Sequence, residues 1–188
     1  VNKTQREIIN TEVTQMLKMG IIRHSNSPWS SPVVLVPKKT GGFRFCVDFR
    51  KLNAVTKKDS YPLPRIDDIL ETLNNCAYFS SLDQAWGYWQ IPIEDKDKEK
   101  TAFVTYNGLY EFNVLPFGLC NAPATFQRLM NLLLADLQWD KCLVYLDDIL
   151  IFSQTFDEHL ERLNLVFTKI KQAGLKLRKE KCNFVQPQ

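Results

Sequence analysis

Two adjacent aspartates, Asp147 and Asp148, are the residues whose types and spacing most clearly indicate chemistry. They interrupt the apolar run at residues 144–152, whose two halves favour short strands joined at an acidic tip. Mg²⁺ takes oxygen ligands and is usually held by one or two carboxylates together with substrate phosphates. The pair therefore indicates a divalent-cation site, and a solvated acidic turn is the alternative for the pair alone.

A third carboxylate, Asp83, ends another strand-like run at residues 78–83 and lies among aromatic residues. Charged side chains are rarely surrounded by apolar neighbours unless they are paired or bind a metal. Three carboxylates from two strands could hold two metal ions about 4 Å apart, the arrangement for in-line phosphoryl transfer. The alternative for Asp83 alone is a helix N-cap.

Composition excludes several other classes of protein. The 188 residues are 45% hydrophobic and 24% charged, which is ordinary for a globular chain of one domain or two small ones. No stretch approaches the roughly 20 apolar residues of a membrane span, and no secretory signal opens the chain. The five cysteines are widely spaced and there are two histidines, so we expect neither a disulfide framework nor a zinc site.

The net charge of +3 is modest, but the basic residues are clustered. One cluster at residues 38–58 has a single acid, Asp48, and a second cluster occupies residues 169–181. Near an acidic metal centre such clusters suit polyanions and nucleotide phosphates, and ordinary solvated surface is the alternative. The first cluster consists of Lys38, Lys39, Arg44, Arg50, Lys51, Lys57 and Lys58.

The first third of the chain predicts a helix followed by a hairpin. Thr4 and Glu7 form a capping box ahead of an apolar stripe, and Gly20 ends the helix. The Lys-rich Gly-Gly tip at residues 37–42 suits closure over a triphosphate or is a plain soluble turn. The other elements expected here are a loop at 25–32 and strands at 33–36 and 43–47.

The remaining patterns predict an α+β fold. The hairpin signals argue against a doubly wound parallel sheet and favour an antiparallel sheet with helices packed on one side. The two acidic runs are then expected as neighbouring central strands. The elements expected are a helix from Pro64 to Leu73, strands at 101–106 and 109–114 around Asn107-Gly108, a helix capped by Asn121, and a helix from the capping box Thr155–Glu158 to Gly174.

Three motifs together resemble a known family. LDxxxGYxQI at 82–91, LPFGLCNAPATFQ at 115–127 and YLDD at 145–148 occur in the order and spacing of the reverse transcriptase of long-terminal-repeat retrotransposons, Ty3/gypsy-like group. The resemblance implies a right-handed polymerase fold in one reverse transcriptase domain over 1–188. It implies fingers at about 1–77 and 93–112 and palm at 78–92 and 113–188, with the chain ending before the family's primer grip and thumb.

The resemblance also implies roles for the carboxylates. Asp83 and Asp147 would be the main ligands of two Mg²⁺ ions, with Asp148 nearby and the Gln84 carbonyl completing one shell; Mn²⁺ could substitute. Lys181 matches the lysine proposed to protonate pyrophosphate. Without metal, like-charge repulsion among the packed carboxylates would raise the pKa of at least one of them, so we expect Mg²⁺ to bind mostly alongside the nucleotide.

Nucleotide contacts follow from the same resemblance. Arg44 matches the fingers arginine that stacks on the incoming base, and Tyr88 occupies the steric-gate position that excludes a ribose 2′-hydroxyl. Ordinary core is the alternative for Tyr88, and the sequence does not choose between Lys38 and Lys39 for the γ-phosphate. The implied nucleotide-binding residues are Lys38, Lys39, Arg44, Tyr88, Phe117 and Gly118.

Template or primer contacts are implied for Asp48, Arg50, Asn53, Gln127 and Tyr145. A purely structural ion pair is the alternative for Asp48 and Arg50. Phe117 indicates the Ty3/gypsy subgroup, because retroviral enzymes carry Gln at this position and Phe is usual in that group.

The implied function is an RNA-directed DNA polymerase that transfers a nucleotide from a dNTP to a primer 3′-hydroxyl. The alternatives are an inert nucleic-acid-binding remnant and a metal-dependent nuclease, which needs the carboxylates but not Tyr88 or Arg44. Expected partners are a primed RNA or DNA template, dNTP, and thumb and RNase H segments of the same polyprotein, with no membrane. The expected location is intracellular, in a cytoplasmic virus-like particle, and the fragment alone is expected to be weakly active or inactive.

Overall fold

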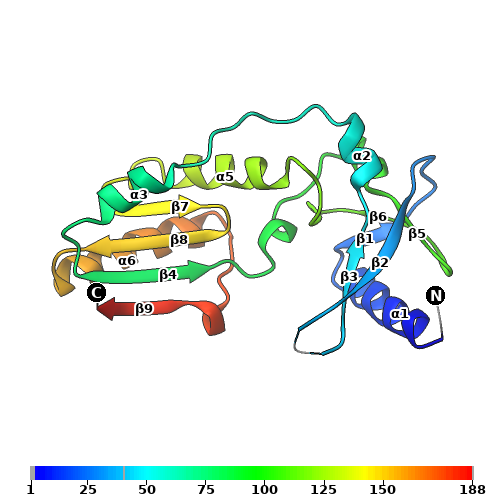
Figure 1. Cartoon of the computed structure of the whole chain (residues 1–188), viewed down its shortest axis with the longest axis horizontal. Helices are drawn as coiled ribbons and strands as arrows, with labels where there is room; N and C mark the ends of the chain where they lie inside the picture. The colour runs from blue at the N-terminus through cyan, green and yellow to red at the C-terminus, as the bar shows by residue number, and fades with distance from the viewer. Residues whose placement is uncertain (1–2, 40, 188) are drawn as a thin grey trace. The chain divides into compact units, whose positions relative to one another are not determined.

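Two sheets, each in its own unit, organise the computed structural model, which describes residues 3–39 and 41–187. The first unit comprises Val1–Lys58 and Ile91–Ala122, and the second comprises Asp59–Gln90 and Pro123–Gln188. These units are defined by contacts along the chain, and the expected limits of fingers and palm stay a prediction. The mixed helices and antiparallel strands confirm the α+β class (Figure 1).

The first unit contains a five-stranded sheet of order β1-β6-β5-β2-β3. Neighbouring strands are antiparallel except β2 and β5, which pair in parallel. The expected hairpin is confirmed, because β5 and β6 pair, but its two connecting residues are Tyr106 and Asn107, since Gly108 already pairs with Thr105. The strands are β1 (Ile22–His24), β2 (Ser31–Pro37), β3 (Phe43–Val47), β5 (Phe103–Thr105) and β6 (Gly108–Phe112); the helices are α1 (Lys3–Lys18), α2 (Arg50–Val55) and the short α4 (Asp95–Lys98).

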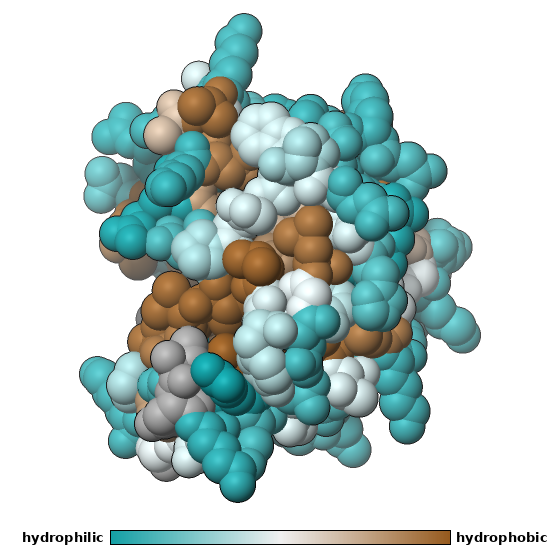
Figure 2. Space-filling model, turned by 90° about the vertical axis from the view of Figure 1, so that its right-hand side faces the viewer, coloured by the Kyte–Doolittle hydropathy of each residue, from teal (hydrophilic) through white to brown (hydrophobic). Residues whose placement is uncertain are grey.

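Two details of the first unit differ from expectation. Thr4 lies inside α1, so it is not the cap of that helix, and β2 begins at Ser31 within the expected loop. The expected stop at Gly20 is confirmed, since its φ of 70° is the left-handed conformation that a helix terminus favours in glycine. The face drawn in Figure 2 is largely hydrophilic with apolar surface in its middle, and apolar side chains exposed in this unit include Val34 and Val36.

The second unit contains a four-stranded antiparallel sheet of order β7-β8-β4-β9. The two acidic runs belong to β4 and β8, which are the central strands, as expected (Figure 1). The strands are β4 (Tyr78–Asp83), β7 (Cys142–Tyr145), β8 (Asp148–Ser153) and β9 (Asn183–Pro187); the helices are α3 (Ile66–Leu73), α5 (Ala122–Leu133) and α6 (Phe156–Gln172).

The two faces of this sheet are covered differently. Ser80 and His159 hydrogen-bond at 2.7 Å, so α6 packs on the face to which even-numbered β4 residues point. The side chain of Gln84, on that same face, donates to Met130 Sδ of α5 at 3.1 Å. On the opposite face, Ile69 of α3 packs against a cluster that includes Leu143. The expectation of helices on one side was therefore wrong for α3, whose own apolar stripe needs a partner surface.

The helix ends around this sheet follow capping chemistry in α6 but not in α3. The Thr155 hydroxyl accepts from the Glu158 amide, and Gly174 follows the last turn with a φ of 71°, so the expected limits of α6 are confirmed. Helix α3 begins at Ile66 after the extended residue Arg65. Pro64 is therefore not its first residue.

Candidate active site

A two-residue turn presents the acidic pair. Tyr145 and Asp148 are the last partners of the β7–β8 ladder, which leaves Leu146 and Asp147 as the connection. Leu146 has a φ of 55°, whereas the φ of Asp147 is not positive, which is the pattern of a type II′ turn. Glycine is favoured at that first position because a Cβ is strained there. The turn therefore stores local strain beside both carboxylates.

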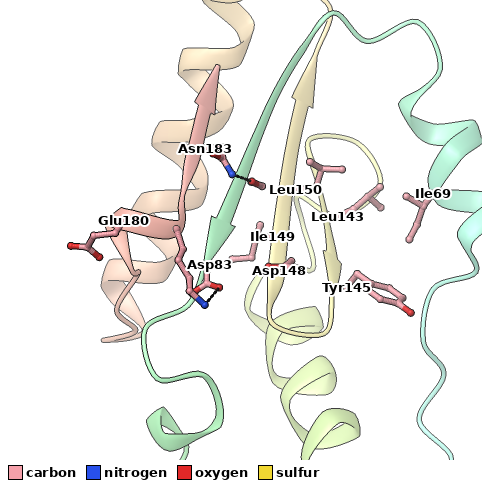
Figure 3. Close-up of a pocket in the computed structure, with 11 residues that line it drawn as sticks. Ile69, Asp83, Leu143, Tyr145, Asp148, Ile149, Leu150, Glu180 and Asn183 are labelled. Atoms are coloured by element: carbon pink, nitrogen blue, oxygen red, sulfur yellow. Dashed lines mark hydrogen bonds and ion pairs between the residues drawn. The ribbon is translucent and has the colours of Figure 1, made fainter. Parts of the chain in front are cut away.

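Asp83 and Asp148 are direct cross-strand partners in the antiparallel β4–β8 pair. Side chains of directly opposed residues point to the same face with Cβ atoms about 5 Å apart. Figure 3 shows the two carboxylates side by side at the ends of neighbouring strands. The structure therefore brings Asp83 and Asp148 together, with Asp147 next to them in the turn.

The pKa of the Asp148 carboxyl is raised above its usual range. Burial is the largest cause, followed by the negative charges of Asp147 and Asp83, while Lys181 acts in the opposite direction. The predicted rise of one carboxyl pKa is thus confirmed, although repulsion is not its main cause. A cation at this position would relieve the repulsion among the three carboxylates.

Lys181 reaches the carboxylates from the segment before β9. Its Nζ lies 3.8 Å from Asp83 Oδ2, and 58% of its side chain is exposed. Backbone bonds fix this segment, because the Arg178 amide donates to the Asp83 carbonyl at 2.9 Å and the Lys181 amide donates to the Arg178 carbonyl at 3.0 Å. The half-exposed ammonium is therefore held beside the carboxylates by the main chain.

A cavity of about 660 Å³ lies on the same face of the sheet (Figure 3). Its floor includes the apolar side chains of Leu143 and Leu150, and Ile69 of α3 contributes one wall. Asp83, Asp148 and other polar residues also line it. The carboxylates thus border a space large enough for a small ligand.

The carboxylates suit metal ions that bring further ligands. Among residues 3–39 and 41–187, no group of three or more His, Cys, Asp or Glu side chains could hold a metal ion by itself. Mg²⁺ is commonly held by one or two carboxylates plus phosphates and waters, so Asp83, Asp147 and Asp148 fit that mode of binding. The Gln84 carbonyl accepts from the Gly87 amide at 3.3 Å and keeps a lone pair for a further partner.

Tyr88 lies in the turn Gly87–Gln90 that follows β4. Its side chain is 8% exposed, and its ring packs edge-on against Phe126 with centroids 5.5 Å apart. Burial raises the pKa of its phenol, and the charge of Asp147 raises it further. Tyr88 is therefore a packed aromatic residue within electrostatic reach of the acidic turn.

The expected nucleotide contacts at the β2–β3 hairpin are solvent-exposed. Lys38, Lys39 and Arg44 are all exposed, and the hairpin is closed by the Lys38 amide donating to the Gly42 carbonyl at 3.0 Å. Thr40, part of the expected tip, lies outside the described residues. These cations belong to the first unit, whereas the three carboxylates belong to the second.

Other expected nucleic-acid contacts in the first unit make internal bonds. Arg50 Nη2 lies 2.7 Å from Asp48 Oδ2, and this partner lowers the pKa of Asp48 to about 2. The Asn53 side chain donates to the Gly118 carbonyl at 2.8 Å and accepts from the Cys120 amide at 2.9 Å. Asn53 therefore braces the loop that leaves the neighbouring Phe117 51% exposed.

The remaining two expected contacts differ in exposure. Tyr145 lines the cavity and is 39% exposed. Gln127 is fully buried and hydrogen-bonds the main chain of the acidic turn, so it offers no side-chain surface to a template. Sequence reasoning missed this arrangement, and the only signal was a polar residue within the apolar stripe of α5.

Known proteins and solved structures show what this chain is similar to. Residues 36–188 match the family described as reverse transcriptase (RNA-dependent DNA polymerase). The chain is 49% identical to the retrovirus-related Pol polyprotein from transposon 297 of Drosophila melanogaster, covering 95% of the chain and 17% of that protein. It is 42% identical to the corresponding polyprotein from transposon gypsy of the same species, covering 95% and 18%. The chain thus spans about one sixth of the length of these relatives.

A more distant relative and solved structures extend the comparison. The Tf2-3 polyprotein of Schizosaccharomyces pombe is 38% identical, covering 97% of the chain and 14% of that protein. The foamy viral protease-reverse transcriptase in complex with an RNA/DNA hybrid has a TM-score of 0.88 at 28% identity, covering 98% of this chain and 25% of that one. A mutant of the prototype foamy virus protease-reverse transcriptase has a TM-score of 0.86 at 30% identity, covering 98% and 24%.

Proposed function

Because this chain belongs to the reverse transcriptase family and its relatives are Ty3/gypsy-type Pol polyproteins, we propose that it carries the polymerase centre of such a polyprotein. The proposed reaction is transfer of a nucleotide from a dNTP to a primer 3′-hydroxyl, directed by an RNA or DNA template. The fingers would comprise about residues 1–77 and 93–112, and the palm residues 78–92 and 113–188. By family resemblance, we further propose a cytoplasmic virus-like particle as its location. Separately, none of the helices in residues 3–39 and 41–187 has the length and apolar character of a membrane span.

One observation carries the proposal: Asp83 and Asp148 face each other across the central strands, with Asp147 in the adjoining turn. Packing of an apolar sheet does not require three carboxylates at the ends of its central strands, and their mutual repulsion opposes folding. The arrangement is explained if the carboxylates bind cations during the reaction. Asp83, Asp147 and Asp148 would hold two Mg²⁺ ions, for which Mn²⁺ could substitute, and the Gln84 carbonyl could add a ligand.

When bound, such ions would lower the pKa of the primer hydroxyl and neutralise the triphosphate. Side chains would supply the proton and the selection of the sugar. Lys181, beside Asp83 in the structure, would hold a proton on Nζ for the departing pyrophosphate. The packed ring of Tyr88 would exclude a ribose 2′-hydroxyl. Phe117 and Gly118 would lie beside the sugar.

Binding of the charged substrates would rest mainly on residues of the first unit. Arg44 would contact the incoming base and its phosphates, and Lys38 or Lys39 the γ-phosphate. Asp48, Arg50 and Asn53 would support the template strand, and Tyr145 the primer end. Most of these contacts are side chains with solvent-exposed cationic or aromatic groups, which suit polyanion binding.

The experiment is primer extension on an RNA template with Mg²⁺ and the four dNTPs. Asp83→Asn and Asp147→Asn should abolish incorporation without unfolding the chain, because an amide cannot supply the negative charge. Asp157→Asn, which removes an exposed aspartate in the first turn of α6, is the matched control and should extend normally.

Two outcomes would replace the proposal. Cleavage of the template by wild type without extension, lost in Asp83→Asn, would indicate a metal-dependent nuclease. Salt-sensitive binding of primer–template with neither reaction would indicate a nucleic-acid-binding remnant. Near-normal extension by Asp83→Asn would show that the centre is assigned to the wrong residues.

A further inference from the structure

One buried side chain, that of Gln127, hydrogen-bonds the strained turn that carries the acidic pair. The Leu146 amide donates to Gln127 Oε1 at 2.8 Å. Gln127 lies on α5 and is fully buried. A non-glycine residue with positive φ persists where its surroundings fix it, and this bond fixes the residue immediately before Asp147.

Both the nitrogen and the oxygen of the Gln127 side-chain amide form hydrogen bonds. Its Nε2 donates to the Val144 carbonyl at 3.0 Å and to Asn131 Oδ1 at 2.9 Å. Because Leu146 offers an N–H and Val144 offers a carbonyl, only one orientation of the Gln127 amide satisfies both. A single side chain therefore grips the end of β7 and the turn that follows it.

A second layer holds Gln127 in that orientation. Asn131 Oδ1 also accepts from Gln138 Nε2 at 2.6 Å, and Asn131 Nδ2 donates to the Tyr61 hydroxyl at 2.8 Å. The Arg128 guanidinium lies 4.7 Å from the centroid of the Tyr61 ring. These contacts connect the middle of α5 to the segment ahead of α3.

The far end of the chain of contacts is an ion pair. Arg128 Nη2 donates to both carboxylate oxygens of Asp59, at 2.8 Å and 2.7 Å. The Tyr61 amide donates to Asp59 Oδ1 at 3.0 Å, which fixes the local turn. This partnership lowers the pKa of the Asp59 carboxyl. The segment 59–61 is therefore tied to α5 by charge, ring and backbone contacts.

On the basis of the polymerase function above, we propose that Gln127 and Asn131 are positioning residues that hold Asp147 and Asp148 in place through Leu146. Asp59, Tyr61 and Arg128 anchor them at the far side of α5. An apolar side chain would fill the space of Gln127, so a fully bonded buried amide indicates selection of one turn geometry. The network acts by orienting the carboxylates.

Loss of the Gln127 amide should affect catalysis differently from loss of a carboxylate. Gln127→Met keeps the length of the side chain but leaves the Leu146 amide without its acceptor. A misplacement of about 1 Å at a reacting centre can lower the rate about 10²-fold. We therefore expect the kcat for incorporation to fall roughly 100-fold, with the KM for dNTP changed less than about threefold.

The experiment combines amide hydrogen exchange with primer extension by the full chain. In Gln127→Met the Leu146 amide should exchange at least about tenfold faster, while the amides of Ile149 and Ile151 in β8 stay protected. Gln172→Met makes the same chemical change at an exposed position at the end of α6, and it should alter neither exchange nor kcat.

Two Asn131 variants keep the test decisive if Gln127→Met does not fold. Asn131→Leu should accelerate Leu146 exchange and lower kcat. Asn131→Asp keeps the oxygen that accepts from Gln127 and Gln138, and its second oxygen replaces Nδ2 and accepts from the Tyr61 hydroxyl, which turns to donate. This variant should therefore stay near wild type in both readouts. This rescue separates the polar role from simple space filling.

The outcomes distinguish this inference from the proposed function. Faster Leu146 exchange with unchanged kcat, or unchanged exchange in both Gln127→Met and Asn131→Leu, would overturn the positioning role. Absence of extension even when the chain is continued through the thumb segment of the polyprotein would instead contradict the proposed function, and the exchange measurement would still report whether the network holds the turn.

Discussion

Tyr88→Val should weaken the choice of deoxyribonucleotides over ribonucleotides. The ring is 8% exposed and packs edge-on against Phe126, so it cannot easily swing away from an added hydroxyl. Forcing extra atoms into a packed site costs about 1–3 kcal/mol. That penalty corresponds to roughly 5- to 150-fold discrimination against ribonucleotides, and Tyr88→Val should lose this discrimination.

The same packing gives the variant a cost in stability. Truncating a buried aromatic side chain costs about 3 kcal/mol at the lower end of observed values. For a chain of this size each kcal/mol lowers the melting temperature by about 2–4 °C, so Tyr88→Val should melt roughly 6–12 °C below wild type. Incorporation must therefore be assayed well below that temperature.

The assay compares kcat/KM for matched ribo- and deoxynucleotides in wild type, Tyr88→Val and Tyr88→Phe. Tyr88→Phe keeps the ring, so its discrimination should stay close to wild type. An unchanged ratio in Tyr88→Val, measured on folded protein, would mean that Tyr88 serves only as core and that the clash has been assigned to the wrong residue.

Three further predictions concern titration, thiols and salt. Burial lowers the pKa of His159, so its neutral form stabilises the fold above the ordinary histidine pKa of about 6.5, and stability should fall as pH drops from 6.5 to 5; a melting temperature whose pH slope is unchanged in His159→Asn would contradict this. Burial raises the pKa of Cys142 to about 12, so a thiol reagent at pH 8 should modify the partly exposed Cys46 well before Cys142, and equal rates in the folded chain would show that Cys142 is accessible. Primer–template binding by this chain should be weak and fall steeply with salt because it depends on basic clusters, and tight, salt-resistant binding measured by fluorescence anisotropy would refute that source of affinity.

Local sequence signals were sufficient for the elements that bring the carboxylates together. Two β-prone runs predicted one strand ending at Asp83 and two strands joined at the tip that carries Asp147 and Asp148. The antiparallel α+β assignment then predicted that the two acidic runs are neighbouring strands, as β4 and β8 are. The cap at Thr155 and the stop at Gly174 were predictable for the same reason, since capping depends on residues within one turn.

Features that depend on tertiary contacts were not predictable from the sequence. The packing of α3 on the cavity face depends on which apolar stripe finds which sheet surface, and a helical period does not specify that. The positive φ of Leu146 contradicts the preference for glycine there, and it is tolerated because Gln127 holds the amide. The role of Gln127 could be recognised only in the folded structure, because its three partners lie up to 19 residues away in the sequence.

The central claim is that Asp83, Asp147 and Asp148 form one cation-binding centre. The most direct measurement is a titration of the isotopically labelled chain with Mn²⁺, in which the paramagnetic ion broadens the amide signals of residues near it. The account predicts that the signals of these three aspartates broaden first and together, at lower Mn²⁺ concentration when dNTP is present. Broadening that begins elsewhere, such as at the acidic residues of 94–97, and leaves the three aspartates sharp would contradict it.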